Sequence, residues 1–90
     1  MGSINLTRDG WTHLMAKAQL SLEDGDYSRA ERLLLQAYEA GVGIFGAHHG
    51  AVGLVLLRLA SVCQRTGRSE LGARYEAEAD DILASYVLEH

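Results

Sequence analysis

The stretch LEDGDYSRAERLLLQAYEA, residues 22–40, places a Gly-Asp-Tyr turn shortly before an alanine in an apolar helical pattern. A second stretch, QRTGRSELGARYEAEADDIL at residues 64–83, repeats this order of turn, small residue and helix. Gly25 and Gly67 are 42 residues apart, and so are Ala30 and Gly72. A fixed offset is typical of proteins built from repeated supersecondary units. The sequence therefore predicts two equivalent helical hairpins.

Apolar residues recur at helical spacing in four segments, and no useful length alternates with the period of a strand. We expect helices from about Thr7 to Asp24, from Tyr27 to Ala40, from His49 to Thr66, and onward from Ser69 as N-cap. Alanine and leucine are abundant and proline is absent, which favours helices. The predicted fold is all-α, a short α-solenoid of four antiparallel helices.

Glycines mark the predicted connections. Gly25 and Gly67 are expected to make tight turns, because glycine readily takes positive φ after a helix. Gly41 and Gly43 are expected to stop the second helix, which leaves GVGIFGAH, residues 41–48, as a linker whose Ile44 and Phe45 are tucked under the hairpins. These glycines do not follow a strand and no Walker lysine accompanies them, so a phosphate-binding loop is disfavoured.

These boundaries define one domain over residues 1–90, with a first repeat at about 7–41 and a second at about 47–87. Residues 88–90 are interpreted as a tag remnant and Met1-Gly2-Ser3 as a cloning remnant. Small residues are predicted where the two helices of a hairpin cross, since larger side chains would push the helix axes apart. The predicted turn and packing residues of the two repeats are Ala18, Gly25, Ala30, Ala60, Gly67 and Gly72.

The pattern resembles the tetratricopeptide repeat (TPR), in particular the 42-residue variety of kinesin light chains. The second repeat is the closer match. The family's run of Gly, His-Pro, Val-Ala, Leu, Leu-Ala and Gly-Arg corresponds to Gly46, His49-Gly50, Val52-Gly53, Leu56, Leu59-Ala60 and Gly67-Arg68. Gly50 and Gly53 replace the family's proline and alanine. The resemblance covers about residues 11–85, and at His49 it implies a residue that helps to start the third helix.

The resemblance also implies a concave groove, lined by the first helix of each repeat, that receives a partner peptide or helix. The matching positions are Thr12, Met15, Ala16 and Gln19 in the first repeat, and Leu54, Leu57, Arg58, Ser61 and Arg65 in the second. Some members hold a terminal carboxylate with a lysine and asparagine clamp. Met15, Gln19, Leu57 and Ser61 occupy those positions here, so that clamp is missing. An alternative is that Leu54 and Leu57 only pack between the repeats.

Composition restricts the function further. The chain has 48% hydrophobic and 22% charged residues, as in globular proteins. Its net charge is −4, and residues 1–45 and 46–90 each hold four Lys/Arg and six Asp/Glu, so a nucleic-acid partner has little support. No signal peptide or membrane-spanning run is visible, and the single cysteine, Cys63, suits a reducing compartment. We expect a cytoplasmic protein.

Candidate chemistry is sparse. His13, His48, His49 and Cys63 are the only soft metal ligands, and no pair shares an i, i+4 spacing on one helix. Cys63 falls in an apolar stripe, which indicates a core residue and not a nucleophile. The carboxylates of Glu76, Glu78 and Asp80-Asp81 are typical of a solvated helix face. We expect no enzyme activity, no metal and no cofactor.

Three hypotheses for function remain. The leading one is a non-catalytic protein-interaction module whose partner is another protein. The second is a structural self-assembly unit, and the third is a metal-binding or regulatory domain. We also expect a homodimer or a fragment of a longer array, because Tyr75, Ile82, Leu83 and Tyr86 on the last helix predict an uncovered apolar flank.

Overall fold

The computed structural model describes residues 7–89, and within that range there are four helices and no strand. The helices are α1 (Arg8–Glu23), α2 (Tyr27–Phe45), α3 (Gly50–Arg65) and α4 (Ser69–Glu89). The prediction of an all-α fold is therefore confirmed. The candidate cloning residues Met1-Gly2-Ser3 and the candidate tag residue His90 lie outside the described residues.

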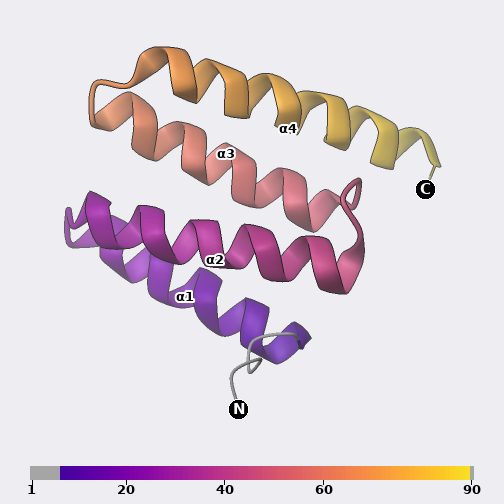
Figure 1. Cartoon of the computed structure of the whole chain (residues 1–90), viewed down its shortest axis with the longest axis horizontal. Helices are drawn as coiled ribbons and strands as arrows, with labels where there is room; N and C mark the ends of the chain where they lie inside the picture. The colour runs from indigo at the N-terminus through magenta and orange to yellow at the C-terminus, as the bar shows by residue number, and fades with distance from the viewer. Residues whose placement is uncertain (1–6, 90) are drawn as a thin grey trace.

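The helices follow one another across the molecule in chain order, and the chain reverses direction at each connection (Figure 1). Packing is mainly between consecutive helices, α1 on α2, α2 on α3 and α3 on α4. The layer measures 34 × 34 × 18 Å, so it is broad and thin. This arrangement leaves α1 and α3 free to share one surface.

The two hairpin turns have the same geometry. Gly25 and Gly67 have φ of 78° and 79°. In each turn the N–H of the residue after the glycine donates to a carbonyl five positions earlier, that of Ser21 at 2.9 Å and that of Cys63 at 2.8 Å. These bonds are typical of a Schellman motif, which satisfies carbonyls left open at a helix end. The 42-residue offset in the sequence therefore relates two turns that have the same backbone structure.

Side chains at the helix starts accept hydrogen bonds from backbone N–H groups that have no partner inside the helix. Thr7, Asp26 and His49 do so for α1, α2 and α3, with lengths of 2.9, 3.2 and 3.0 Å. The N-cap of α4 lies one residue before the predicted position, Ser69. Ser69 is the first helical residue and not the cap, because the carbonyl of Arg68 already accepts an N–H of the first turn.

The expected linker at residues 41–48 is wrong. α2 does not stop at Gly41 and Gly43 but continues to Phe45, so the connection to α3 is only the four residues 46–49. A glycine lowers helix propensity by about 1 kcal/mol, a cost that tertiary packing can offset. Here the residues that follow, Val42 and Ile44, pack against the core as part of the helix.

The neighbours of Gly41 explain why this position inside α2 is a glycine. It is buried, and a Cβ built there would lie 3.2 Å from Nε1 of Trp11 on α1 and 3.5 Å from Cγ2 of Val52 on α3. The indole ring of Trp11 continues this contact, since it meets the ring of Phe45 edge-on at 5.3 Å between centroids. Gly41 therefore makes room for neighbouring helices.

Four of the predicted turn and packing residues, Ala18, Ala30, Ala60 and Gly72, are buried within helices, whereas Gly25 and Gly67 are exposed in the turns. Ala18 and Ala30 are fully buried, and Ala60 is 4% exposed. A Cβ on Gly72 would lie 3.1 Å from the carbonyl oxygen of Ala60 and 3.3 Å from Cβ of Cys63, so α3 and α4 approach closely there. The largest fully buried side chains complete the core, and they are Leu34, Leu56, Leu59, Val52, Val55, Val62 and Cys63.

The inner side of α4 packs on α3 more completely than the sequence suggested. Ile82 is 6% exposed, and Tyr75, Leu83 and Tyr86 are half-buried. Leu83 fits against Gly53, where a Cβ would come within 2.9 Å of the leucine Cγ. The absence of side chains on Gly50 and Gly53 therefore lets α4 lie close to the start of α3.

Candidate functional site

A pocket of about 310 Å³ opens between α1 and α3, close to the turns that end these helices. Its wall consists of Gln19, Leu22, Glu23, Tyr27, Arg58, Ser61 and Arg65. Four of these, Gln19, Arg58, Ser61 and Arg65, are predicted groove residues, so the pocket brings together four of the nine predicted positions. The lining mixes cations, a carboxylate, neutral polar groups and the apolar Leu22.

The other predicted groove residues do not line this pocket. Thr12 on α1 is exposed, and Leu54 on α3 is 40% exposed. Met15 and Leu57 are half-buried and pack against the core. For Leu57 the structure therefore supports the alternative interpretation as a packing residue, whereas Leu54 presents an apolar surface to solvent.

A hydrogen-bonded chain crosses the pocket from one helix to the other. The amide nitrogen of Gln19 donates to a carboxylate oxygen of Glu23 at 3.3 Å, one turn further along α1. The amide oxygen of Gln19 accepts from a terminal nitrogen of Arg58 on α3. The Nε of Arg58 is buried and has no hydrogen-bond partner among residues 7–89. Leaving a charged donor unpaired costs free energy, so this guanidinium has unused binding capacity.

Arg65 and Tyr27 close the end of the pocket. A terminal nitrogen of Arg65 donates to the hydroxyl of Tyr27 at 3.5 Å. Tyr27 is the first residue of α2 and is half-buried against the core. Its position follows from the Gly25 turn, which returns the chain beneath the end of α1. The pocket wall therefore comes from three helices.

Charge is segregated by helix, although it is balanced between the two halves of the chain. The helix α3 contains Arg58 and Arg65 and no acidic residue. The helix α4 contains one arginine, Arg74, against six acidic residues, which are Glu70, Glu76, Glu78, Asp80, Asp81 and Glu89. The pocket thus lies on the cationic helix, while α4 contributes none of its lining.

Sequence reasoning missed Leu22, Glu23 and Tyr27 as pocket residues. The signal for Glu23 was present, because Glu23 and Arg65 are 42 residues apart and occupy equivalent positions in the two repeats. The predicted groove positions include Arg65 but not Glu23. Tyr27 belongs to the second helix of its hairpin, which the resemblance does not assign to the groove.

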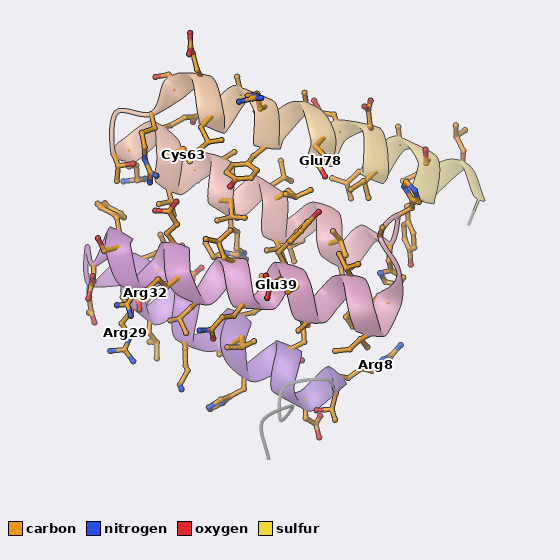
Figure 2. All side chains as sticks on the ribbon, viewed as in Figure 1. Arg8, Arg29, Arg32, Glu39, Cys63 and Glu78 are labelled. Carbon is orange, nitrogen blue, oxygen red and sulfur yellow. The ribbon has the colours of Figure 1, made fainter. Side chains whose placement is uncertain are left out.

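The groups with candidate chemistry lie elsewhere in the described residues. None of the pocket residues is a histidine or a cysteine. His13 and His48 are exposed, and His49 is half-buried as the cap of α3. Among residues 7–89, no three His, Cys, Asp or Glu side chains gather as a metal site would require. Cys63 lies between α3 and α4 (Figure 2), and burial raises the pKa of its thiol, an effect that nearby Arg68 partly opposes.

Two contacts join the hairpins outside the pocket. Arg68 forms a two-pronged ion pair with Glu31 of α2, with N–O distances of 2.8 and 3.0 Å. Glu78 of α4, which points toward α3 in Figure 2, hydrogen-bonds with Tyr38 of α2. Burial, followed by the charge and hydrogen bond of Glu78, raises the pKa of Tyr38.

No protein-family model matches the sequence, and no curated protein or solved structure matches it either. Of the helices described, none combines the length and the hydrophobicity needed to cross a bilayer. The function must therefore be argued from the pocket and its surroundings.

Proposed function

We propose that this chain is a non-catalytic protein-interaction module of the TPR type. It binds a partner peptide or helix in the groove between α1 and α3. The observation that carries the proposal is the pocket at the end of that groove, where Gln19, Arg58, Ser61 and Arg65 meet. All four are groove positions that the resemblance to the tetratricopeptide repeat implies.

The equivalence of the two hairpins supports the TPR assignment. Gly25 and Gly67 share one backbone conformation, and the hydrogen bonds that follow them are in the same 42-residue register. Buried small residues at Ala18, Ala30 and Gly72 allow the close helix approach that the repeat requires. A lone, buried Cys63 is compatible with a reducing compartment, so we place the module in the cytoplasm.

The chemistry of the pocket favours binding over catalysis. Its wall offers guanidinium, amide and hydroxyl donors beside the apolar Leu22, which is the mixture that a peptide chain can pair with. Nucleophilic catalysis needs a nucleophile with an adjacent base. Ser61 lies in the pocket, but among the described residues its hydroxyl makes no hydrogen bond to Glu23 or to another base.

Selection from a random peptide library displayed on phage tests this proposal. The immobilised chain should enrich related peptides, and the variant Arg58→Met with Arg65→Gln should lose them. Arg74→Gln is the matched control, because Arg74 is exposed on α4 and does not line the pocket. If no peptide is enriched, or if the double variant retains the same peptides, the groove is not the binding surface.

A further inference from the structure

We propose that the chain binds further copies of itself end to end, with the outer side of α4 in one copy against the outer side of α1 and α2 in the next. The inference goes beyond the proposed function, because it concerns the two ends of the layer of helices and not the groove. It rests on the 42-residue register, which relates the contact between the two hairpins to the two outer sides that remain exposed.

The contact between the hairpins shows which side of α2 meets the next unit. Glu31 pairs with Arg68, and Tyr38 hydrogen-bonds with Glu78, so both α2 residues face the second hairpin. Leu34 is one helical turn from each of them and therefore lies on the same side. It is fully buried in the core. This side of α2 is thus partly apolar and covered.

The matching side of the second hairpin is also apolar. Arg58 on α3 reaches Gln19 of the first hairpin. Leu59 and Val62 follow Arg58 on the same helix and are fully buried in the core. Burial of apolar side chains therefore holds the first hairpin against the second.

At the α4 end of the layer, the equivalent positions are acidic. The equivalents of Leu34 and Tyr38, 42 residues further along, are Glu76 and Asp80. Both are exposed. The side of α4 that would meet a following unit therefore carries negative charge where α2 carries buried side chains.

At the α1 end, the equivalent positions carry the opposite charge. The equivalent of Leu59 is Lys17, which is exposed, and the equivalent of Val62 is Leu20, which is 61% exposed. Arg29 of α2 adds a second cation and points away from the second hairpin in Figure 2. This end therefore offers positive charge beside an apolar side chain.

A second copy fits these two ends because the register places opposite charges against each other. Lys17 would face Glu76, as Leu59 and Leu34 face each other across the hairpins. Complementary potentials of this kind favour association and fix its register. The acidic Asp26, which is equivalent to Arg68, would meet the uncharged Ala73, which is equivalent to Glu31. No like charges are brought together at these positions.

The signs of the charges also decide the kind of assembly. A polar outer face is enough to keep the end of a helical array soluble, and it does not require opposite signs at the two ends. A symmetric dimer through either end would place like charges together. The contact is therefore head to tail, and a head-to-tail contact that does not close builds an open row of copies.

Light scattering tests the inference on the whole chain. At about 0.01 M salt, where the Debye length is about 30 Å, the average mass should rise with protein concentration. At about 1 M salt, where that length is about 3 Å, the mass should fall to that of one chain.

Charge reversal identifies the surfaces. Lys17→Glu with Arg29→Glu makes both ends acidic, and Glu76→Lys with Asp80→Lys makes both ends basic. Each double variant alone should stay monomeric where the original chain associates, and an equimolar mixture should associate again. All four positions are exposed, and circular dichroism verifies that the variants fold.

Asp81→Lys is the matched control for Asp80→Lys. It makes the same change of charge at the next residue, which is exposed but about 100° further around the helix. Asp80→Lys should abolish the rise in mass, and Asp81→Lys should preserve it.

Three results would overturn the inference. A single-chain mass at low salt means that the charges only keep the two ends in water. Association of either double variant alone, at the level of the original chain, means that another surface is used. Equal effects of Asp80→Lys and Asp81→Lys mean that the register does not define the contact. The peptide selection is independent of these outcomes, because Arg58 and Arg65 are unchanged in every variant.

Discussion

Gly25 and Gly67 end α1 and α3 in one shared conformation, with φ of 78° and 79°. Among the described residues, no atom beyond the glycine and its two chain neighbours lies within 4 Å of the place that a Cβ would take at Gly25 or Gly67. A side chain at these positions therefore meets backbone strain but no clash. Because the two turns are equivalent, the same substitution should lower the free energy of unfolding by the same amount in both.

Gly25→Ala and Gly67→Ala should each lower the free energy of unfolding by about 1–2 kcal/mol, the cost of holding an L-residue in the left-handed region. Urea denaturation followed by circular dichroism measures this. Gly43→Ala is the control, because Gly43 is an exposed residue within α2 and alanine should stabilise a helix there by up to about 1 kcal/mol. Clearly unequal losses in the two turns would contradict the equivalence of the hairpins.

Ala30→Leu and Ala18→Leu should each destabilise the chain, because both alanines are fully buried where α1 meets α2. Overpacking of a core typically costs about 1–3 kcal/mol, a large part of the stability of a small domain. Thermal melting compares them with Ala77→Leu at an exposed position of α4. An unchanged melting temperature in both core variants would mean that neither alanine limits the helix approach.

The sequence correctly predicted the structural features that are determined by residues adjacent in the chain. The turn at Gly25 and the start of α2 at Tyr27 follow from adjacent residues, and both were located correctly. The end of α2 was not, because Gly41 reads as a helix stop in sequence. Its role depends on Trp11 and Val52, which are distant in the chain and come together only in the folded structure.

The site was predictable to the extent that the family resemblance implies it. The resemblance to the tetratricopeptide repeat gave Gln19, Arg58, Ser61 and Arg65 as groove positions, and these four share the pocket. It gave no reason to include Tyr27, whose contact with Arg65 depends on how the second helix packs. Hydrogen bonds such as that from Arg58 to Gln19 depend on side-chain rotamers, which no sequence period encodes.

Stability should fall at alkaline pH because burial raises the pKa of Tyr38, with the charge and hydrogen bond of Glu78 adding to the effect. The unfolded chain then loses the tyrosine proton first as pH rises. The stabilisation is thus complete below the unfolded pKa of about 10 and is lost as pH passes through the higher folded value. Tyr75 and Cys63, whose pKa values burial also raises, act in the same direction.

Urea denaturation between about pH 8 and about pH 11 measures this linkage. Tyr38→Phe removes one of the three groups, so its unfolding free energy should depend less steeply on pH than that of the original chain. Identical pH dependence in the two proteins would show that Tyr38 titrates alike in the folded and unfolded states.

The thiol of Cys63 should react slowly with a disulfide reagent in the folded chain. It is fully buried, and burial raises its pKa, so little thiolate is available to attack. Gln64→Cys supplies an exposed thiol next to it on α3, which should react at once while Cys63 does not. The absorbance of the thiol released from the reagent measures the fast and the slow reaction. Unfolding in urea should merge the two reactions into a single fast one. Fast reaction of both thiols without urea would contradict the burial of Cys63.

The packing of each helix mainly on its predecessor has a consequence for how the chain reaches its fold. Residues that meet are close in sequence, so few long loops must close before contacts form. Helical proteins whose contacts are mainly local fold in microseconds to milliseconds. Either hairpin can begin the process, since the turns at Gly25 and Gly67 form from local hydrogen bonds. Because α1 packs mainly on α2 and α4 mainly on α3, these outer helices should be the first to open when the native protein fluctuates.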